Sequence, residues 1–93
     1  MEARFLISAR NDLAALRDHY RRTLPSEARV GQMHLFEALA AIKRNPEIGL
    51  PLPAPSGLRA FRVPFLPFAL IYRVEGGRVE FLRLRRLDQS VRP

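Results

Sequence analysis

The sequence PFALIYRVEGGRVEFLRLRR (residues 67–86) contains two apolar runs on either side of a glycine pair. The first run is rich in β-branched and aromatic residues, which are typical of strands, and the second alternates apolar residues with charged ones. Gly76 and Gly77 suit the positive φ angles of a two-residue type I′ turn. We therefore predict a β-hairpin with strands at about 68–75 and 78–86.

Counting outward from this turn predicts the register and the two faces of the hairpin. One face holds the pairs Val74–Val79, Tyr72–Phe81, Leu70–Arg83 and Phe68–Arg85; the other holds Arg73–Glu80, Ile71–Leu82 and Ala69–Leu84. We predict that the second, aliphatic face packs under helices, that the first face binds a partner, and that Arg73 and Glu80 form an ion pair. A β-bulge near Phe81 and Leu82 would instead exchange Arg83 and Arg85 between the faces.

A third strand is predicted upstream, over about 58–65, although Pro64 and Pro67 would interrupt its hydrogen bonding. The preceding segment, PEIGLPLPAPSG (residues 46–57), has four prolines and two glycines. It is predicted to be a connector without regular structure.

The first half of the chain predicts a short strand and two helices. The strand covers Ala3 to Ser8, and Ser8 is the expected N-cap of a helix that runs to about Thr23. Ser26 follows a proline and is expected to cap the second helix, with Glu27 in its first turn. That helix should stop at Asn45-Pro46, because the residue before proline disfavours helical geometry. The expected fold is α+β, in one domain of residues 1–93: an N-terminal strand, an antiparallel α-hairpin and three C-terminal antiparallel strands in one small sheet.

Charge and composition narrow the classes of function. The net charge is +7, and residues 57–93 carry +5 of it, with 8 of the 16 basic and 3 of the 9 acidic residues. This balance predicts nonspecific binding of polyanions that weakens with salt. Cysteine is absent, and no apolar run approaches the length of a membrane span, so we expect a cytoplasmic protein that does not insert into membranes.

The chain offers few groups for catalysis. Its histidines, His19 and His34, lie in predicted helices without metal-ligand spacing, and no nucleophile triad or phosphate-binding loop can be assembled. Tyr20 and Tyr72 are expected to be at least partly buried. We expect no cofactor and no metal site, and the scarcity of proton-transfer groups weighs against an enzyme.

The order of these segments resembles the RelE/ParE superfamily of toxins from bacterial toxin–antitoxin modules. The resemblance covers about residues 3–88 and is most specific at Pro46 to Gly49, at Gly57-Leu58-Arg59 and at LIYRV (residues 70–74) before the tight turn. It implies either a RelE-like nuclease that cuts mRNA on the ribosome or a ParE-like toxin that poisons DNA gyrase. A third alternative is a family member that only binds its antitoxin.

The residues favour the ParE-like alternative. A RelE-like arginine on the strand corresponds to Ala69, Arg86 occupies the place of a common histidine, and no Tyr or His follows Tyr72. Arg62 does match a basic position, so Arg62 and Arg86 are the candidate residues if the protein is a nuclease. For the ParE-like reading the candidate target-binding residues are Arg59, Arg62, Arg83, Arg85 and Arg86, and no catalytic residue is assigned. The resemblance implies two partners, DNA gyrase and a cognate antitoxin whose acidic or amphipathic segment lies across the helices and the sheet.

Overall fold

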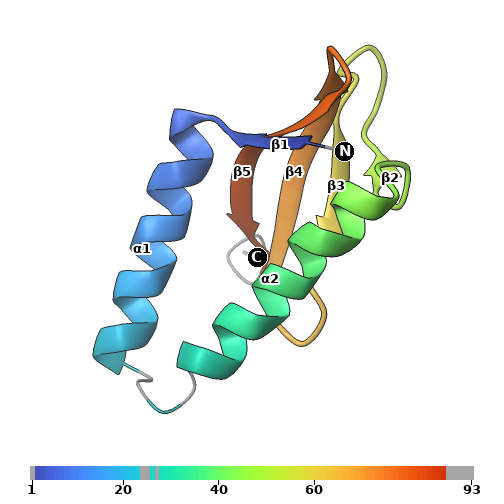
Figure 1. Ribbon diagram of the computed structural model, residues 1–93. Coiled ribbons are helices and arrows are strands. Elements are labelled where there is room, and N and C mark those ends of the chain that lie inside the picture. Colours follow the sequence, from blue (N-terminus) through green and yellow to red (C-terminus); the bar gives the residue numbers. More distant parts are fainter. Residues whose placement is uncertain (1, 24–25, 27, 88–93) are drawn as a thin grey trace, which may run out of the picture.

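The computed structural model describes residues 2–23, 26 and 28–87. These residues form two helices and one five-stranded sheet (Figure 1). The elements are β1 (Glu2–Phe5), α1 (Ile7–Thr23), α2 (Ala28–Arg44), β2 (Leu50–Pro51), β3 (Arg59–Arg62), β4 (Phe68–Glu75) and β5 (Arg78–Arg86). The α+β class with its N-terminal strand, α-hairpin and C-terminal strands is therefore confirmed.

The strand order across the sheet is β1-β5-β4-β3-β2. β1 lies parallel to β5, with Glu2 opposite Arg78 and Phe5 opposite Phe81, and the other neighbours are antiparallel. The strand at one end of the sequence thus pairs with the strand at the other. β2 belongs to the segment 46–57 that was predicted to lack regular structure; its two residues pair with β3 and extend the sheet by one short edge strand.

The hairpin of β4 and β5 has the predicted bounds, and both turn glycines have positive φ (59° at Gly76 and 76° at Gly77). The predicted register holds from the turn to the pair Tyr72–Phe81. Beyond it the pairing shifts by one residue, so that Leu82 is the extra residue of a β-bulge. The pairs that follow are Ile71–Arg83, Leu70–Leu84, Ala69–Arg85 and Phe68–Arg86.

The core lies on the face of the sheet that carries Tyr72 and Phe81, which are both fully buried. Because of the bulge, Leu84 joins Leu70 on this face, where Ala9 of α1 and Ile42 of α2 also pack. The prediction that the aliphatic face of Ala69 and Ile71 packs under the helices was therefore wrong. The two aromatic rings remove more apolar surface from water than the smaller side chains, and they belong to the buried face.

Helix ends follow the sequence signals in part. α2 ends at Arg44, one residue before Asn45-Pro46, as predicted. α1 begins earlier than predicted, so Ser8 lies inside the helix instead of capping it; the N–H of Arg10 donates to the carbonyl of Leu6, at the start of the helix. The predicted first turn of the second helix includes Glu27, which lies outside the described residues.

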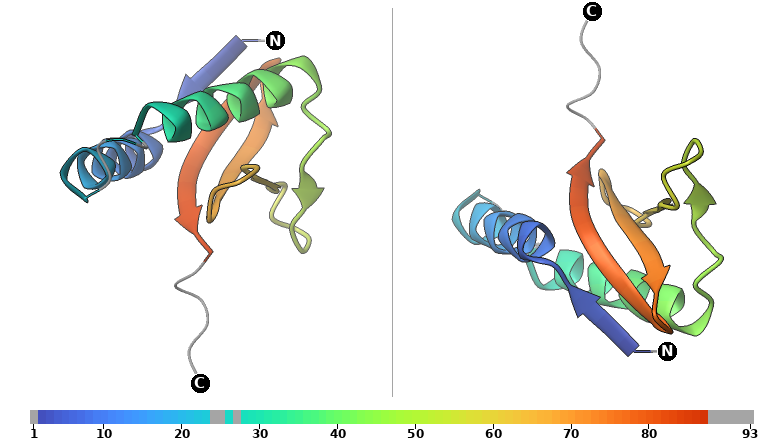
Figure 2. Two further views of the ribbon diagram at one scale, coloured as in Figure 1. Left: turned by 90° about the horizontal axis from the view of Figure 1, so that it is seen from below. Right: turned by 90° about the horizontal axis from the view of Figure 1, so that it is seen from above.

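The two helices diverge from their connecting end, and each packs separately on the sheet (Figures 1 and 2). α1 runs beside β5, whereas α2 crosses in front of the strands. The helices are in contact at Tyr20, whose ring would lie 3.3 Å from a Cβ atom placed on the buried Gly31. No helix in the described part of the chain is long and apolar enough to cross a membrane.

Candidate binding surfaces

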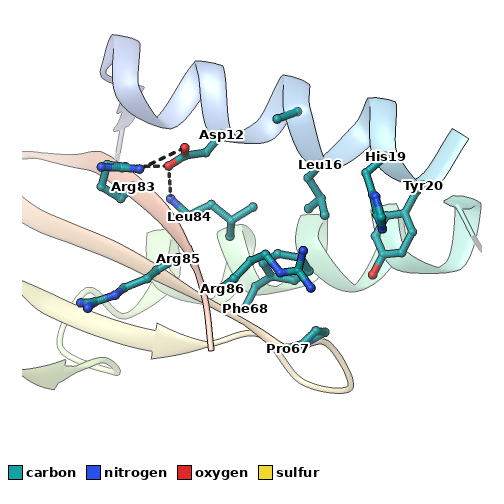
Figure 3. Close-up of a pocket in the computed structure, with 11 residues that line it drawn as sticks. Asp12, Leu16, His19, Tyr20, Pro67, Phe68, Arg83, Leu84, Arg85 and Arg86 are labelled. Carbon is teal, nitrogen blue, oxygen red and sulfur yellow. Dashed lines mark hydrogen bonds and ion pairs between the residues drawn. The ribbon is translucent and has the colours of Figure 1, made fainter. Parts of the chain in front are cut away.

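Arg83 is held by α1 (Figure 3). Its Nε donates to Oδ2 of Asp12 at 2.8 Å, and its Nη2 lies 3.3 Å from Oδ1. This hydrogen bond, together with the charge of Asp12, raises the pKa of the Arg83 guanidinium above its ordinary value. The same carboxylate accepts the backbone N–H of Leu84 at 2.9 Å, so Asp12 covers the edge of β5 just beyond the end of β1.

Arg85 and Arg86 leave β5 on opposite faces (Figure 3). Arg86 lies above Phe68 and lines a cleft of about 650 Å3 between α1 and the end of β5, which His19 and Tyr20 also line. Arg83 and Arg85 are also among the residues that line this cleft, although the side chain of Arg85 extends away from Leu16 and Tyr20 in Figure 3. The three arginines that the sequence placed in one cluster thus line the same cleft, but their surroundings differ: Arg83 is ion-paired to Asp12, and Arg85 and Arg86 leave β5 on opposite faces.

A different pair of arginines shares a face. In the register of β3, β4 and β5, Arg62 lies beside Ala69, and Ala69 lies beside Arg85. These three residues therefore form a row across the face of the sheet that no helix covers. Arg62 and Arg85 are both exposed, and neither guanidinium makes a hydrogen bond or ion pair to a residue that the structure describes.

Arg59 instead holds the connector against the sheet. Its Nη1 donates to the carbonyls of Gly49 (2.7 Å) and Glu47 (3.3 Å). Next to it, the buried hydroxyl of Tyr72 donates to the carbonyl of Pro46 (2.6 Å) and accepts the N–H of Gly49 (2.9 Å). Burial raises the pKa of Tyr72, although the hydrogen bond from Gly49 and the charge of Arg59 act in the opposite direction. These bonds give a structural role to Pro46–Gly49, one of the segments on which the resemblance in sequence rests.

The predicted Arg73–Glu80 ion pair is present, with Nε and Oε1 2.9 Å apart. Glu80 also lies 3.9 Å from the guanidinium of Arg4 on β1. Glu80 is only 7 % exposed, so two arginines from adjacent strands compensate one nearly buried charge.

The two histidines lie apart on different helices. His19 contacts Thr23 and the ring of Tyr20, and His34 lies near Glu37 and Phe65. Among the described residues, no three His, Cys, Asp or Glu side chains are grouped so that they could hold a metal ion.

The diverging helices leave an apolar groove of about 350 Å3 between them. Its lining includes Leu13, Leu16, Tyr20, Leu35, Phe36 and Leu39, with Arg17 and Arg21 among its charged residues. Helical spacing in the sequence places these leucines on the inner sides of the two helices. It does not show that the helices stand far enough apart to leave a groove.

A second apolar feature lies on the outer side of α2. Val30 and Met33 are about half exposed, Phe36 is 72 % exposed and Phe65, in the loop between β3 and β4, is 86 % exposed. The ring of Phe65 lies 4.9 Å from that of His34. Phe65 has φ of 70°, and no other described residue except glycine has a positive φ. Nothing in the sequence around Phe65 indicated this conformation.

A family model for the ParE toxin of the parDE type II toxin–antitoxin system matches residues 4–90. The chain belongs to this ParE toxin family. A search of curated proteins found no match.

Two solved structures are similar to this chain in fold. A chain from the chromosomal ParDE toxin–antitoxin system of P. aeruginosa is similar with a TM-score of 0.79 and 28% identity, over 94% of this chain and 96% of that one. The YoeB/ParE toxin of Agrobacterium tumefaciens has a TM-score of 0.64 and 22% identity, over 92% and 98% of the two chains. The second likeness concerns the fold alone.

Proposed function

We propose that this ParE-family protein is a toxin that inhibits DNA gyrase by binding it in the cytoplasm, and that a cognate antitoxin neutralises it. Membership of the ParE family carries the proposal. The helix-free face supports binding over nuclease chemistry, because it presents Arg62 and Arg85 around Ala69. The described tyrosines and histidines lie elsewhere: Tyr72 in the core, and the other three on the helices.

The helix-free face is the proposed contact for the target. Arg62 and Arg85 have no internal partner among the described residues, so their charges are available to an acidic surface. Arg83 and Arg59 are already bonded within the fold and would have to release Asp12 or two carbonyls first.

The groove between α1 and α2 is the proposed contact for the antitoxin. Its lining combines apolar side chains with Arg17 and Arg21, a combination that fits an acidic amphipathic helix. The similar ParDE system from P. aeruginosa includes an antitoxin, which is consistent with this assignment.

Two assays on the purified protein test the target. We expect inhibited supercoiling or trapped cleaved DNA with gyrase, and no codon-specific mRNA cleavage in a translating extract. The double variant R62E/R85E should lose gyrase inhibition, whereas R10E/R29E, with the same change in charge at exposed helix positions, should retain it. Specific mRNA cuts with unaffected gyrase would establish the RelE-like alternative. Inactivity in both assays, without a growth defect, would indicate a protein that only binds its antitoxin.

A further inference from the structure

The exposed apolar residues of α2 form one continuous band. Val30, Met33 and Phe36 follow one another at three-residue spacing, so that each adjoins the next on the helix surface. His34 is four residues from Val30, and Phe65 lies against His34. At its other end the band reaches the groove between the helices, because Phe36 lines that groove.

Phe65 is the most unusual member of this band. A left-handed backbone is unfavourable for an aromatic residue, and glycine would adopt it without that cost. Burial of the ring does not compensate, since contact with His34 leaves Phe65 86 % exposed. A large ring held in a strained conformation in water indicates that its favourable contact is made with another molecule.

We propose that the antitoxin segment that fills the groove continues across α2 at Phe36 and Met33 and ends on Phe65, which serves as an anchor of the interface. This inference rests on the proposed function, since it extends the antitoxin site. The continuity of the band with the groove through Phe36 favours one partner for both.

The charges beside the band favour an acidic segment. Exposed cations on the same helix are Arg29, Lys43 and Arg44, and Glu37 is its one acidic residue. The partner segment should therefore present apolar side chains toward α2 and carboxylates toward these cations.

The test measures the dissociation constant and dissociation rate of the toxin with the product of the reading frame adjacent to its gene. F65G removes the ring and relieves the backbone, and V30Q/M33Q removes apolar surface while placing glutamine, a good helix former, at both positions. Each should weaken binding by at least about tenfold, mainly through faster dissociation. L50Q is the matched control, because Leu50 is 75 % exposed but lies on β2, outside the band; it should change affinity less than about twofold. Unchanged thermal unfolding of F65G would show that the loss does not come from misfolding.

Three other results would contradict this inference or the antitoxin assignment on which it rests. If F36Q weakens the complex while F65G and V30Q/M33Q behave like L50Q, the partner stops at the groove, and this inference is overturned although the antitoxin assignment stands. If the wild-type toxin self-associates and F65G is monomeric, a second copy covers the band, which also overturns it. If the adjacent product does not bind the wild-type toxin at all, the antitoxin assignment itself fails.

Discussion

Single residues fix the connector to the sheet in this protein. The Tyr72 hydroxyl bonds two backbone groups of residues 46–49, and Gly49 lies so close that an added Cβ would be 2.6 Å from the hydroxyl oxygen. Glycine is required there by space, since its φ is not in the left-handed region. The Tyr72 hydroxyl therefore has a structural role, since it joins the connector to β4.

Removing the Tyr72 hydroxyl should destabilise the fold. Y72F leaves the N–H of Gly49 and the carbonyl of Pro46 without their partner, and we expect a loss of about 1–3 kcal/mol in the free energy of unfolding. G49A should also destabilise, because its methyl group collides with the hydroxyl. In the double variant the collision is partly relieved, so urea unfolding should show a combined loss smaller than the sum of the two. Strict additivity would contradict the proposed contact.

Tyr72 also predicts an alkaline limit to stability. Its pKa is raised in the folded state from the ordinary value of 10.0, so the folded protein holds the phenolic proton more tightly than the unfolded chain does. This contribution is fully present below pH of about 10 and is lost as the pH rises through the folded pKa. The unfolding free energy of the wild type should therefore fall more steeply above pH of about 10 than that of Y72F. Parallel curves for the two proteins would rule out this contribution.

Two elements of the sheet are shaped by single residues, the outer edge of β5 by Asp12 and the loop between β3 and β4 by Phe65. β1 pairs with β5 only as far as Phe81. Beyond that point the carboxylate of Asp12 accepts a hydrogen bond from the backbone N–H of Leu84 on β5. The loop between β3 and β4 is similarly defined by one residue, the strained Phe65. Both features join parts of the chain that are distant in sequence.

Asp12 should matter more to stability than its ion-pair partner. D12A leaves the partly buried N–H of Leu84 without an acceptor, which should cost about 1–3 kcal/mol. R83A removes an exposed guanidinium and leaves the Leu84 bond intact, so its effect should be clearly smaller. Thermal unfolding of the two variants gives the comparison, and a larger loss for R83A would contradict this role of Asp12.

The loop between β3 and β4 should prefer glycine to alanine at position 65. Both substitutions remove the contact between the ring and His34, but only glycine relieves the positive φ. The relief is worth about 1–2 kcal/mol and exceeds the extra backbone entropy of glycine, about 0.5–1 kcal/mol. F65G should therefore unfold at a higher temperature than F65A. The reverse order, usual at exposed positions, would mean that Phe65 is not strained.

At the scale of the whole molecule, local patterns predicted much of the architecture. The bounds of β4 and β5 follow from Gly76-Gly77, and the end of α2 follows from Asn45-Pro46. The bulge at Leu82 carries no comparable signal, because no glycine or turn residue marks it, and this one residue decides which face holds Arg83 and Arg85. The contact of Asp12 with β5 and the strain at Phe65 depend on tertiary packing, which periodicity does not encode.

The net charge of +7 predicts salt-dependent binding to nucleic acids. The affinity for a DNA duplex should fall as salt rises, and removing an arginine that contacts a phosphate should make the slope of log affinity against log salt shallower by about 0.9. R62A/R85A should reduce the slope more than R10A/R29A, because Arg62 and Arg85 share one face and lack internal partners among the described residues. Fluorescence anisotropy over a salt series measures this, and equal slopes for the two variants would mean that the charge acts diffusely.

The parallel pairing of β1 with β5 limits how early this protein can fold during its synthesis on the ribosome. Glu2 to Phe5 emerge first, yet their partners, Arg78 to Phe81, are among the last described residues to be made. The packing of α1 also depends on β5, because α1 contacts this strand and Asp12 accepts a hydrogen bond from the backbone N–H of Leu84. Such distant contacts form late in folding. A nascent chain that lacks β5 can form neither the complete sheet nor the contacts of α1 with β5, so we expect the fold to be completed only after β5 has been made and has emerged from the ribosome.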